Sequence, residues 1–339
     1  MRASRPAQPT AERIRDDRPA YRPFRVTVRS VARLSPSFLR VTFAGDELAG
    51  FGAAGLDQRI KLVLPLDGAG APAGYDHLGM FEPETVATGG WYERWRAVRP
   101  ELRNPFRTYT VRAIRQQERE LDVDFAVHGD GGPASRWVRT ARAGDEIVIV
   151  GPDDASTGWR IGLDWHPGGR DELLLVGDET AVPAVCSIFG SLDPKVRATA
   201  FLEVPEHGDI LDIACADAGH TVNWLPREGG ERGARLVPEV RAWALSHRQV
   251  VAPAAVAPDA PGSTPGAEEA ELRVPEGDGD SELIWDSPAE ADDAGFYAWI
   301  AGETQTVVTL RRFLVKELGV ERSRVAFMGY WRRGRAELA

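Results

Sequence analysis

The sequence has only two cysteines among its 339 residues, Cys186 and Cys215, and they form neither a CxxC pair nor a metal-ligand spacing. Its six histidines are also scattered, so nothing in the chain suggests a disulfide framework or a structural metal. No apolar run reaches the roughly 18 residues that a membrane-spanning helix requires. The first residues are polar and arginine-rich without a hydrophobic core, so they do not resemble a secretory signal. These absences favour a cytoplasmic protein with two unlinked thiols and no membrane partner.

Basic residues are scarce in one segment. The whole chain has a net charge of −10. Between Pro253 and Asp293, twelve acidic residues stand against one base, Arg273, so this segment carries −11 and the remainder is close to neutral. No basic stripe with interleaved aromatic residues occurs elsewhere, and we therefore expect no nucleic-acid partner.

Short strand-like segments fill the first half of the chain. Apolar and polar residues alternate in six runs, separated by Gly, Pro and Asp: FRVTVRS, FLRVTFAG, RIKLVLP, TYTVRAI, LDVDFAVH and EIVIVGP. This pattern predicts an antiparallel β-barrel or sandwich between Phe24 and about Gly151. Gly132 and Pro133 suit the start of a helix.

The pattern changes after about Gly168. The strand-like runs ELLLVGDET, ATAFLEV, HTVNWL, FYAWIAGE and RVAFMGY now occur with the helix-like runs AVPAVCSIFGSL and TQTVVTLRRFLVKEL. In the last of these, Val307, Leu310, Phe313 and Leu314 fall on one helical face. Strands that alternate with helices predict a doubly wound parallel sheet.

These patterns predict two domains. We expect a disordered leader at residues 1–21, a β-barrel domain at 22–167 and an α/β domain at 168–339. An acidic insertion at about 250–282 interrupts the second domain, after a short helix at Leu236–Leu245. The insertion is rich in Ala, Pro, Gly and Glu and poor in aromatic residues, so it cannot bury enough apolar surface to become ordered.

The run FRTYTVR, Phe106–Arg112, is a strand with an arginine near each end. A barrel followed by an α/β domain is the layout of reductases that hold a flavin on the barrel and a nicotinamide on the sheet. Tyr109 can then lie against the flavin ring, Thr110 can hydrogen-bond its edge, and Arg107 can bind phosphate oxygens bidentately. The alternative is a surface strand with charged ends, and spacing alone leaves both open.

Two further runs are glycine-rich or polar turns before a helix. In DFAVHGDGGPASRW, Gly129, Gly131 and Gly132 free the backbone, and the helix start that follows can bind a pyrophosphate. In LLLVGDETAVPA, a polar turn ends the first parallel strand, where doubly wound sheets bind ligands. The second run is not GxGxxG. A plain turn without function remains the alternative for each.

Five motifs together carry a resemblance that none carries alone. RTYTVR, VHGDGGPASRW, GDETAVPA, WIAGE and the closing GYWRRG, in this order and at these separations, resemble the siderophore-interacting protein family. These are FAD-dependent ferric-siderophore reductases related to the ferredoxin reductase fold. The resemblance extends from Phe24 to Gly334. It implies that the barrel domain binds FAD and the α/β domain binds NAD(P)H, and only the leader and the acidic insertion depart from it.

The resemblance also implies roles for individual residues. FAD would be bound by Arg107, Tyr109, Thr110, Val111, Asp124, His128, Gly132, Ala134 and Ser135. NAD(P)H would be bound by Gly177, Asp178, Glu179, Thr180, Ala181, Ala301, Gly302 and Glu303. The ferric siderophore would meet basic residues, for which the candidates are Lys61, Arg136 and Arg332, and the flavin would be covered by Tyr330 or Trp331.

The implied reaction needs no side-chain nucleophile. NADH or NADPH gives a hydride to FAD, and the reduced flavin passes single electrons to siderophore-bound iron(III), which releases iron(II). One alternative is a reductase that shares the fold and passes electrons to a redox protein such as ferredoxin. Another is a non-catalytic carrier of siderophore or flavin. The choice between NADH, through Glu203 or Glu206, and NADPH, through Arg227 or Arg232, stays open. We expect a monomer.

Overall fold

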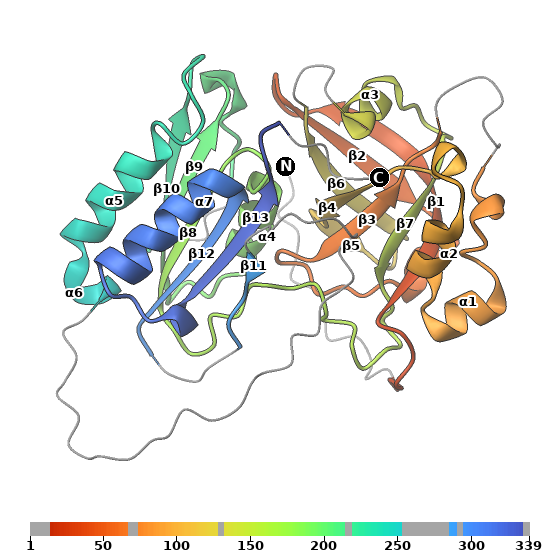
Figure 1. Cartoon of the computed structure of the whole chain (residues 1–339), viewed down its shortest axis with the longest axis horizontal. Coiled ribbons are helices and arrows are strands. Elements are labelled where there is room, and N and C mark those ends of the chain that lie inside the picture. Colours follow the sequence, from red (N-terminus) through yellow and green to blue (C-terminus); the bar gives the residue numbers. More distant parts are fainter. Residues whose placement is uncertain are drawn as a thin grey trace.

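The computed structural model describes residues 14–66, 74–127, 132–213, 219–252, 285–289 and 294–334. Figure 1 shows two β-sheets side by side: a curled sheet from the first half of the chain, and a flatter sheet flanked by helices from the second. The predicted fold class, an antiparallel barrel followed by a doubly wound α/β unit, is confirmed. Within the described ranges, no helix has both the length and the apolar character needed to cross a membrane.

Seven strands form the first sheet in the order β4-β3-β7-β1-β2-β6-β5, and all neighbours are antiparallel. The alternating pattern of each run places one set of side chains in a shared core, in which Phe24, Val41, Phe43 and Phe125 are fully buried. The strands are β1 (Tyr21–Arg33), β2 (Phe38–Ala44), β3 (Arg59–Val63), β4 (Phe106–Thr110), β5 (Ala113–Arg115), β6 (Glu120–Ala126) and β7 (Glu146–Pro152).

The predicted continuous strand TYTVRAI is divided in the structure. β4 pairs with β3 at one edge of the sheet, whereas β5 pairs with β6 at the other edge. Between them, the Val111 N–H bonds the Gln58 carbonyl at 2.9 Å, and the Arg112 N–H bonds the Asp122 carbonyl at 2.9 Å. The motif therefore crosses from one edge to the other and closes the curl, and this crossing interrupts the strand.

Three helices pack against the curled sheet, of which the sequence pattern predicted only the third. α1 (Pro83–Thr88) and α2 (Trp91–Ala97) follow the β3 region, and α3 (Pro133–Thr140) begins at the predicted Pro133. Trp91, Tyr92 and Trp95 of α2 pack with Phe106 in an aromatic cluster beside β7. Turns of 3-10 helix occur in this half at Asp46–Gly50, Asp76–Leu78 and Pro100–Leu102.

The second sheet has the order β10-β9-β8-β12-β13-β11, in which only β11 is antiparallel to its neighbour. α5 and α7 cover the face toward the viewer in Figure 1, and α4 covers the other. The elements are β8 (Glu172–Gly177), α4 (Val182–Phe189), β9 (Arg197–Val204), β10 (His220–Pro226), α5 (Leu236–Ser246), α6 (Arg248–Val251), β11 (Trp285–Asp286), β12 (Phe296–Glu303), α7 (Thr304–Arg311) and β13 (Val325–Trp331).

The helix predicted for TQTVVTLRRFLVKEL is present, although its second half is a π-helix, Arg312–Glu317. Its predicted apolar face is confirmed, because Val307, Leu310, Phe313 and Leu314 are all buried against the sheet. The short helix predicted near Leu236 is α5. Further 3-10 turns lie at His207–Asp209 and Arg322–Arg324. Cys186 is buried in α4, and Cys215 lies outside the described residues.

The two sheets share part of one core. Phe38 of β2 and Trp165 of the segment between β7 and β8 pack among residues of the second sheet and α4, including Tyr297 and Trp299 of β12. Beside them, the buried Asp209 carboxylate accepts hydrogen bonds from Ser35 Oγ at 2.6 Å and from the Ser37 N–H at 2.7 Å. The β1–β2 turn is thereby attached to the loop after β9.

Candidate functional site

The end of the FRTYTVR motif lies against α4 of the second sheet. Ser187 Oγ is within hydrogen-bond distance of both the Val111 and Arg112 carbonyls, at 3.3 and 2.9 Å. Since α4 directly follows the GDET turn, this contact brings the predicted flavin strand and the predicted nicotinamide turn together. Ser187 was missed in the sequence because a serine inside an apolar helix gives no sign of a distant partner.

The aromatic residue of the motif belongs to a line of rings that pack at a tilt. Tyr109 packs on Phe125 with ring centroids 4.4 Å apart, and Phe125 contacts Trp137 of α3 at 5.8 Å. Tyr109 remains half-buried, as does Arg107, whose Nη1 donates to the Phe106 carbonyl at 2.7 Å. β4 and the start of α3, both predicted to hold FAD, therefore lie on the same part of the sheet.

Two arginines meet the predicted residue Asp124. Its carboxylate is only 3% exposed and accepts two hydrogen bonds from Arg40, at 2.6 and 2.8 Å. This contact raises the pKa of Arg40. Arg112 Nε lies 3.6 Å from the same carboxylate, is buried, and donates no hydrogen bond among the described residues. Asp124 is therefore approached by two cations, one from β2 and one from the end of the FRTYTVR motif. The sequence did not reveal Arg40, because its pairing with Asp124 depends on the β2–β6 register.

The helix start predicted to bind pyrophosphate is α3. Gly132 is its N-cap, and a Cβ added there would meet no atom within 4 Å, so open space adjoins the first turn. Ala134 is buried, Ser135 is half-buried and Arg136 is exposed. Thr110 and Val111 are buried at the end of β4. The predicted residue His128 lies outside the described residues.

The turn after β8 is built around one buried carboxylate. Asp178 accepts hydrogen bonds from Thr180 N and Oγ1, at 2.9 and 2.5 Å, from the Glu303 N–H at 2.8 Å and from Trp331 Nε1 at 2.9 Å. Its pKa is raised to about 6, first because the carboxylate is buried and second because Glu179 carries a like charge. Asp178 thus ties the ends of β8, β12 and β13 together.

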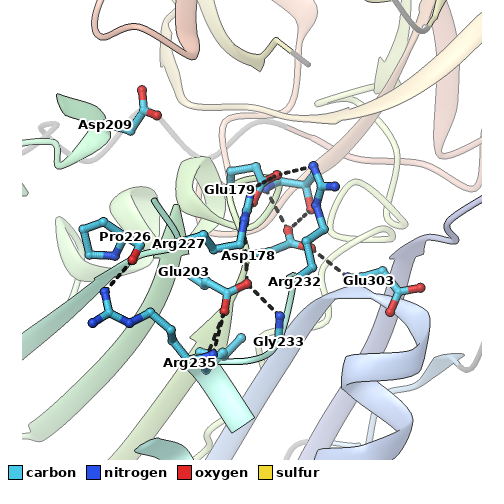
Figure 2. A network of polar contacts seen from close by, with 12 residues as sticks. Asp178, Glu179, Glu203, Asp209, Pro226, Arg227, Arg232, Gly233, Arg235 and Glu303 are labelled. Atoms are coloured by element: carbon cyan, nitrogen blue, oxygen red, sulfur yellow. Dashed lines mark hydrogen bonds and ion pairs between the residues drawn. The ribbon is translucent and has the colours of Figure 1, made fainter. Parts of the chain in front are cut away.

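A second polar network lies next to this turn (Figure 2). Glu179 is fully buried and pairs with Arg227 at 2.6 and 3.0 Å and with Arg232 at 3.0 Å. Arg232 also lies over the Trp331 ring, 4.8 Å from its centroid. The Glu203 carboxylate accepts backbone N–H bonds from the start of α5, at Gly233, Arg235 and Leu236. The carboxylate of Glu203 and the guanidinium of Arg227 therefore both bind other groups of the protein.

The ends of β8 and β12 define the ligand-binding edge of the second sheet. The chain leaves β8 toward β9 and leaves β12 toward β13, on opposite sides, so the strand order reverses between them. Open α/β sheets bind ligands at such a point. A small pocket is present there, lined by Asp178, Glu203, Arg232, Glu303 and Thr306 among others. Ala301 and Gly302, predicted for the nicotinamide, end β12 beside Gly177.

The predicted siderophore residues occupy three elements. Lys61 Nζ on β3 donates to Thr108 Oγ1 at 2.7 Å and lies near the Phe106 ring. Arg136 is exposed on α3, and Arg332 is exposed directly after β13. That the three face one substrate stays a prediction.

The two predicted flavin-covering residues have different surroundings. Tyr330 stacks on Trp285, with centroids 5.8 Å apart, and meets Trp299 edge-on at 6.2 Å. Trp331 instead lies beside the GDET turn through its bond to Asp178. Trp331 is thus the one of the pair that borders the predicted nicotinamide site.

Two family descriptions match consecutive parts of the chain. The one named "Siderophore-interacting FAD-binding domain" matches residues 27–156, and the one named "Siderophore-interacting protein" matches residues 170–334. The first contains the flavin strand and α3. The second contains the GDET turn, the end of β12 and the end of β13.

Named relatives and a solved structure align with most of this chain. The "Ferric vibriobactin reductase ViuB" of Vibrio cholerae is 28% identical over 306 residues, covering 90% of this chain and 88% of that protein. The "NADPH-dependent ferric-chelate reductase" of Escherichia coli is 27% identical over 325 residues, covering 94% and 96%. The crystal structure of the siderophore-interacting protein SipS from Aeromonas hydrophila is 27% identical, covers 94% of this chain and 95% of its own, and has a TM-score of 0.61.

Proposed function

The chain belongs to the siderophore-interacting protein family, and from this premise we propose that it is an FAD-dependent ferric-siderophore reductase. The observation that carries the proposal is the contact of Ser187 with the Val111 and Arg112 carbonyls. It joins the strand proposed to hold the flavin to the helix that follows the nicotinamide turn. Two relatives that align over most of this chain carry names of ferric reductases.

The residues beside β4 fit a flavin dinucleotide. Arg112 has a buried Nε that donates no hydrogen bond among the described residues, and open space adjoins Gly132 at the start of α3. We assign the phosphate oxygens to Arg107, Arg112 and the N–H groups of α3, and the flavin ring to Tyr109 and Thr110. When bound, FAD supplies the chemistry: it accepts a hydride from the nicotinamide and passes single electrons to iron(III).

The crevice between β8 and β12 is assigned to the nicotinamide. Gly177 and Gly302 keep it open, because a Cβ at Gly302 would lie 2.7 Å from Asp178 Oδ2. Asp178 holds the edge of the crevice in shape through backbone and indole N–H groups, so its role is to position and not to react. Trp331, at the border of this crevice, is our assignment for the residue that covers the flavin.

The substrate is assigned as an anionic ferric chelate. Lys61, Arg136 and Arg332 are the basic residues proposed to attract it, and transfer of one electron to iron(III) releases iron(II), which oxygen ligands bind far more weakly. Glu203 and Arg227 are committed to internal contacts. Arg232 also pairs with Glu179, at 3.0 Å, and the Glu206 side chain caps the turn His207–Asp209. The choice between NADH and NADPH therefore stays open.

Anaerobic visible spectra of the purified protein test the proposal. The protein should be yellow with bound FAD, lose this colour after NADH or NADPH, and regain it when a ferric siderophore is added, with iron(II) formed. Bleaching without recovery by any chelate would favour the reductase whose acceptor is a redox protein. A protein that binds ferric siderophore but does not bleach would favour the carrier. A colourless protein that takes up no FAD would refute the flavin assignment.

A further inference from the structure

Two buried aspartates meet where the two sheets join, outside the site described above. Asp57 lies in the loop before β3 and is 0% exposed, and Asp164 lies in the segment between β7 and β8 and is 4% exposed. The Asp164 N–H donates to Asp57 Oδ2 at 3.1 Å, so the two residues are in direct contact. Buried carboxylates normally have a matched cation or a full set of hydrogen bonds.

The second sheet provides the remaining donors. Trp299 Nε1 of β12 donates to Asp57 Oδ2 at 2.9 Å, and Trp285 Nε1 of β11 donates to Asp164 Oδ1 at 3.0 Å. The hydroxyl of Tyr297 donates to the Asp164 carbonyl at 3.0 Å. The other carboxylate oxygens, Asp57 Oδ1 and Asp164 Oδ2, accept no hydrogen bond from the described residues, and neither does the buried Tyr330 hydroxyl make one.

The two carboxylates differ in the cations near them. Arg59 Nε lies 3.3 Å from Asp164 Oδ2, whereas no lysine or arginine among the described residues lies within ion-pair distance of Asp57. Asp57 is therefore a buried carboxylate without an ion-pair partner among these residues, and one proton would remove its charge. The other titratable or charged groups facing the pair are Tyr21 from β1, His166 and Arg170 from the segment before β8, Tyr297 from β12 and Tyr330 from β13.

We propose that Asp57 and Asp164 share one proton, and that the protonated pair is a positioning device which holds the nicotinamide sheet against the flavin strand. The role in positioning rests on the proposed reductase function, whereas the shared proton does not. Asp57 precedes Gln58, whose carbonyl accepts the Val111 N–H at 2.9 Å. Its partner Trp299 lies on β12, which ends in the nicotinamide residues Ala301, Gly302 and Glu303.

Loss of the proton would affect both the loop that contains Asp57 and the strand β12 that contains Trp299. It would place a second negative carboxylate near Asp164 inside the protein, and the pair would separate or admit water. Burial first, and the charge of Asp164 second, raise the pKa of Asp57 to about 7. The unfolded value is about 3.9, so the folded protein retains the proton that the unfolded chain has lost. Stability should therefore fall as pH rises from about 4 to about 7, and change little with this group above that.

Asp57→Asn is the main variant, because an amide has the shape of a protonated carboxyl. Its oxygen can accept from Trp299 and its NH₂ group can donate toward Asp164 Oδ2. We expect the infrared band of protonated carboxylic acids at about pH 6 to be weaker in Asp57→Asn than in the wild type, and thermal stability to fall more steeply between about pH 4 and pH 7 in the wild type. If Asp57→Asn does not fold, Asp164→Asn should weaken the same band. An unchanged band in the variant that folds would overturn the shared proton.

Kinetics of the FAD-loaded protein test the positioning role. In the wild type, the rate of flavin reduction by nicotinamide should fall about tenfold between about pH 6 and pH 8.5, the scale expected for a small misplacement of reacting groups. Asp57→Asn should hold the low-pH rate throughout. Asp153→Asn is the matched control, since Asp153 is also buried but lies 3.3 Å from its own cation, Arg22, and it should keep the wild-type profile.

The outcomes separate the two hypotheses. A pH profile of Asp57→Asn that matches the wild type would refute the positioning role. A protein whose flavin is never reduced by NADH or NADPH would refute the proposed function and, with it, the positioning role. The shared proton would still be decided by the infrared band and the unfolding curves, which need no nicotinamide.

Discussion

Gly177 and Gly302 occupy positions where any side chain would collide with the nicotinamide turn. A Cβ at Gly177 would lie 2.3 Å from the Ala181 Cβ, and Gly302 has a φ of +140° that L-residues rarely adopt. Both contacts involve the GDET turn or the Asp178 carboxylate. The two glycines therefore bring the ends of β8 and β12 close to one another, and the shape of the crevice depends on them.

Gly302→Ala should therefore impair reduction of the flavin without releasing FAD. The new methyl group would push Asp178 from its position, and we expect the rate of flavin reduction by nicotinamide to fall about tenfold or more. Stopped-flow absorbance measures this rate, and the flavin content of the purified protein measures retention. Gly319→Ala is the control, because it also has a positive φ, +80°, but nothing lies within 4 Å of its Cβ position. Equal rates in both variants would contradict the assignment of the crevice.

Two basic residues of the first sheet should have separable roles. Arg107→Ala should weaken FAD binding about tenfold or more, because a charge-assisted bond to phosphate contributes about 1.5 to 3 kcal/mol. Lys61→Ala should leave FAD bound and raise the KM for the ferric siderophore. Titration of the apoprotein with FAD and steady-state iron(II) formation measure the two effects. Normal FAD affinity in Arg107→Ala would contradict the phosphate assignment, and each variant controls for the other.

The chemistry of single residues could be predicted only where the motif itself contained it. Arg107, Tyr109 and Thr110 could be proposed because their side chains suit a phosphate and a flavin ring at adjacent positions. Arg40 could not, because it reaches Asp124 from a strand 84 residues away. Nor could the capping of α5 by Glu203 be predicted, since it depends on how the loop before that helix folds back.

At the scale of elements, the FRTYTVR motif is more than a strand. It leaves β4 at one edge of the curled sheet and enters β5 at the other, and Ser187 of α4 contacts the crossing point. Periodicity predicted strands on both sides of this point because each alternates in the usual way. It could not predict the break, which arises because Val111 and Arg112 take their partners from different strands. The α1–α2 region was missed for a related reason, since two short helices give too few turns for a clear period.

Ser187→Ala should weaken the connection between α4 and the flavin strand. The variant leaves the Arg112 carbonyl without this donor, and we expect about 1 kcal/mol lower stability together with slower flavin reduction. Chemical denaturation and stopped-flow absorbance measure the two effects. Ser191→Ala is the matched control, because the Ser191 hydroxyl bonds the Ser187 carbonyl just beyond the same helix. If both variants reduce the flavin at the wild-type rate, the contact does not couple the two parts of the site.

At the scale of the whole molecule, the two sheets are joined by contacts between residues far apart in the sequence. Trp299 Nε1 and Asp57 are 242 residues apart, and Asp209 and Ser35 are 174 residues apart. The fold class of each half follows from local patterns, since alternation and βα repetition are read within short windows. The packing between the halves does not, because it depends on pairs of residues that no local window contains.

Phe38 offers the sharpest test of this shared core. It belongs to β2 of the first sheet, yet its fully buried ring packs among residues of the second sheet and α4. Phe38→Ala should lower stability by about 3 to 5 kcal/mol and, because the lost contacts lie between the sheets, should separate the unfolding of the two halves. Flavin reduction should slow at the same time, since the flavin strand would no longer be fixed against α4.

Phe43→Ala is the matched control for this variant. Phe43 lies on the same strand and is equally buried, but its ring packs inside the first sheet. Its loss should destabilise that sheet by a similar amount and should leave the packing between the sheets intact. Calorimetry of the apoproteins distinguishes the two cases. One cooperative transition in Phe38→Ala, as in the wild type, would show that the remaining polar contacts at Asp57 and Asp209 are enough to make the two sheets unfold together.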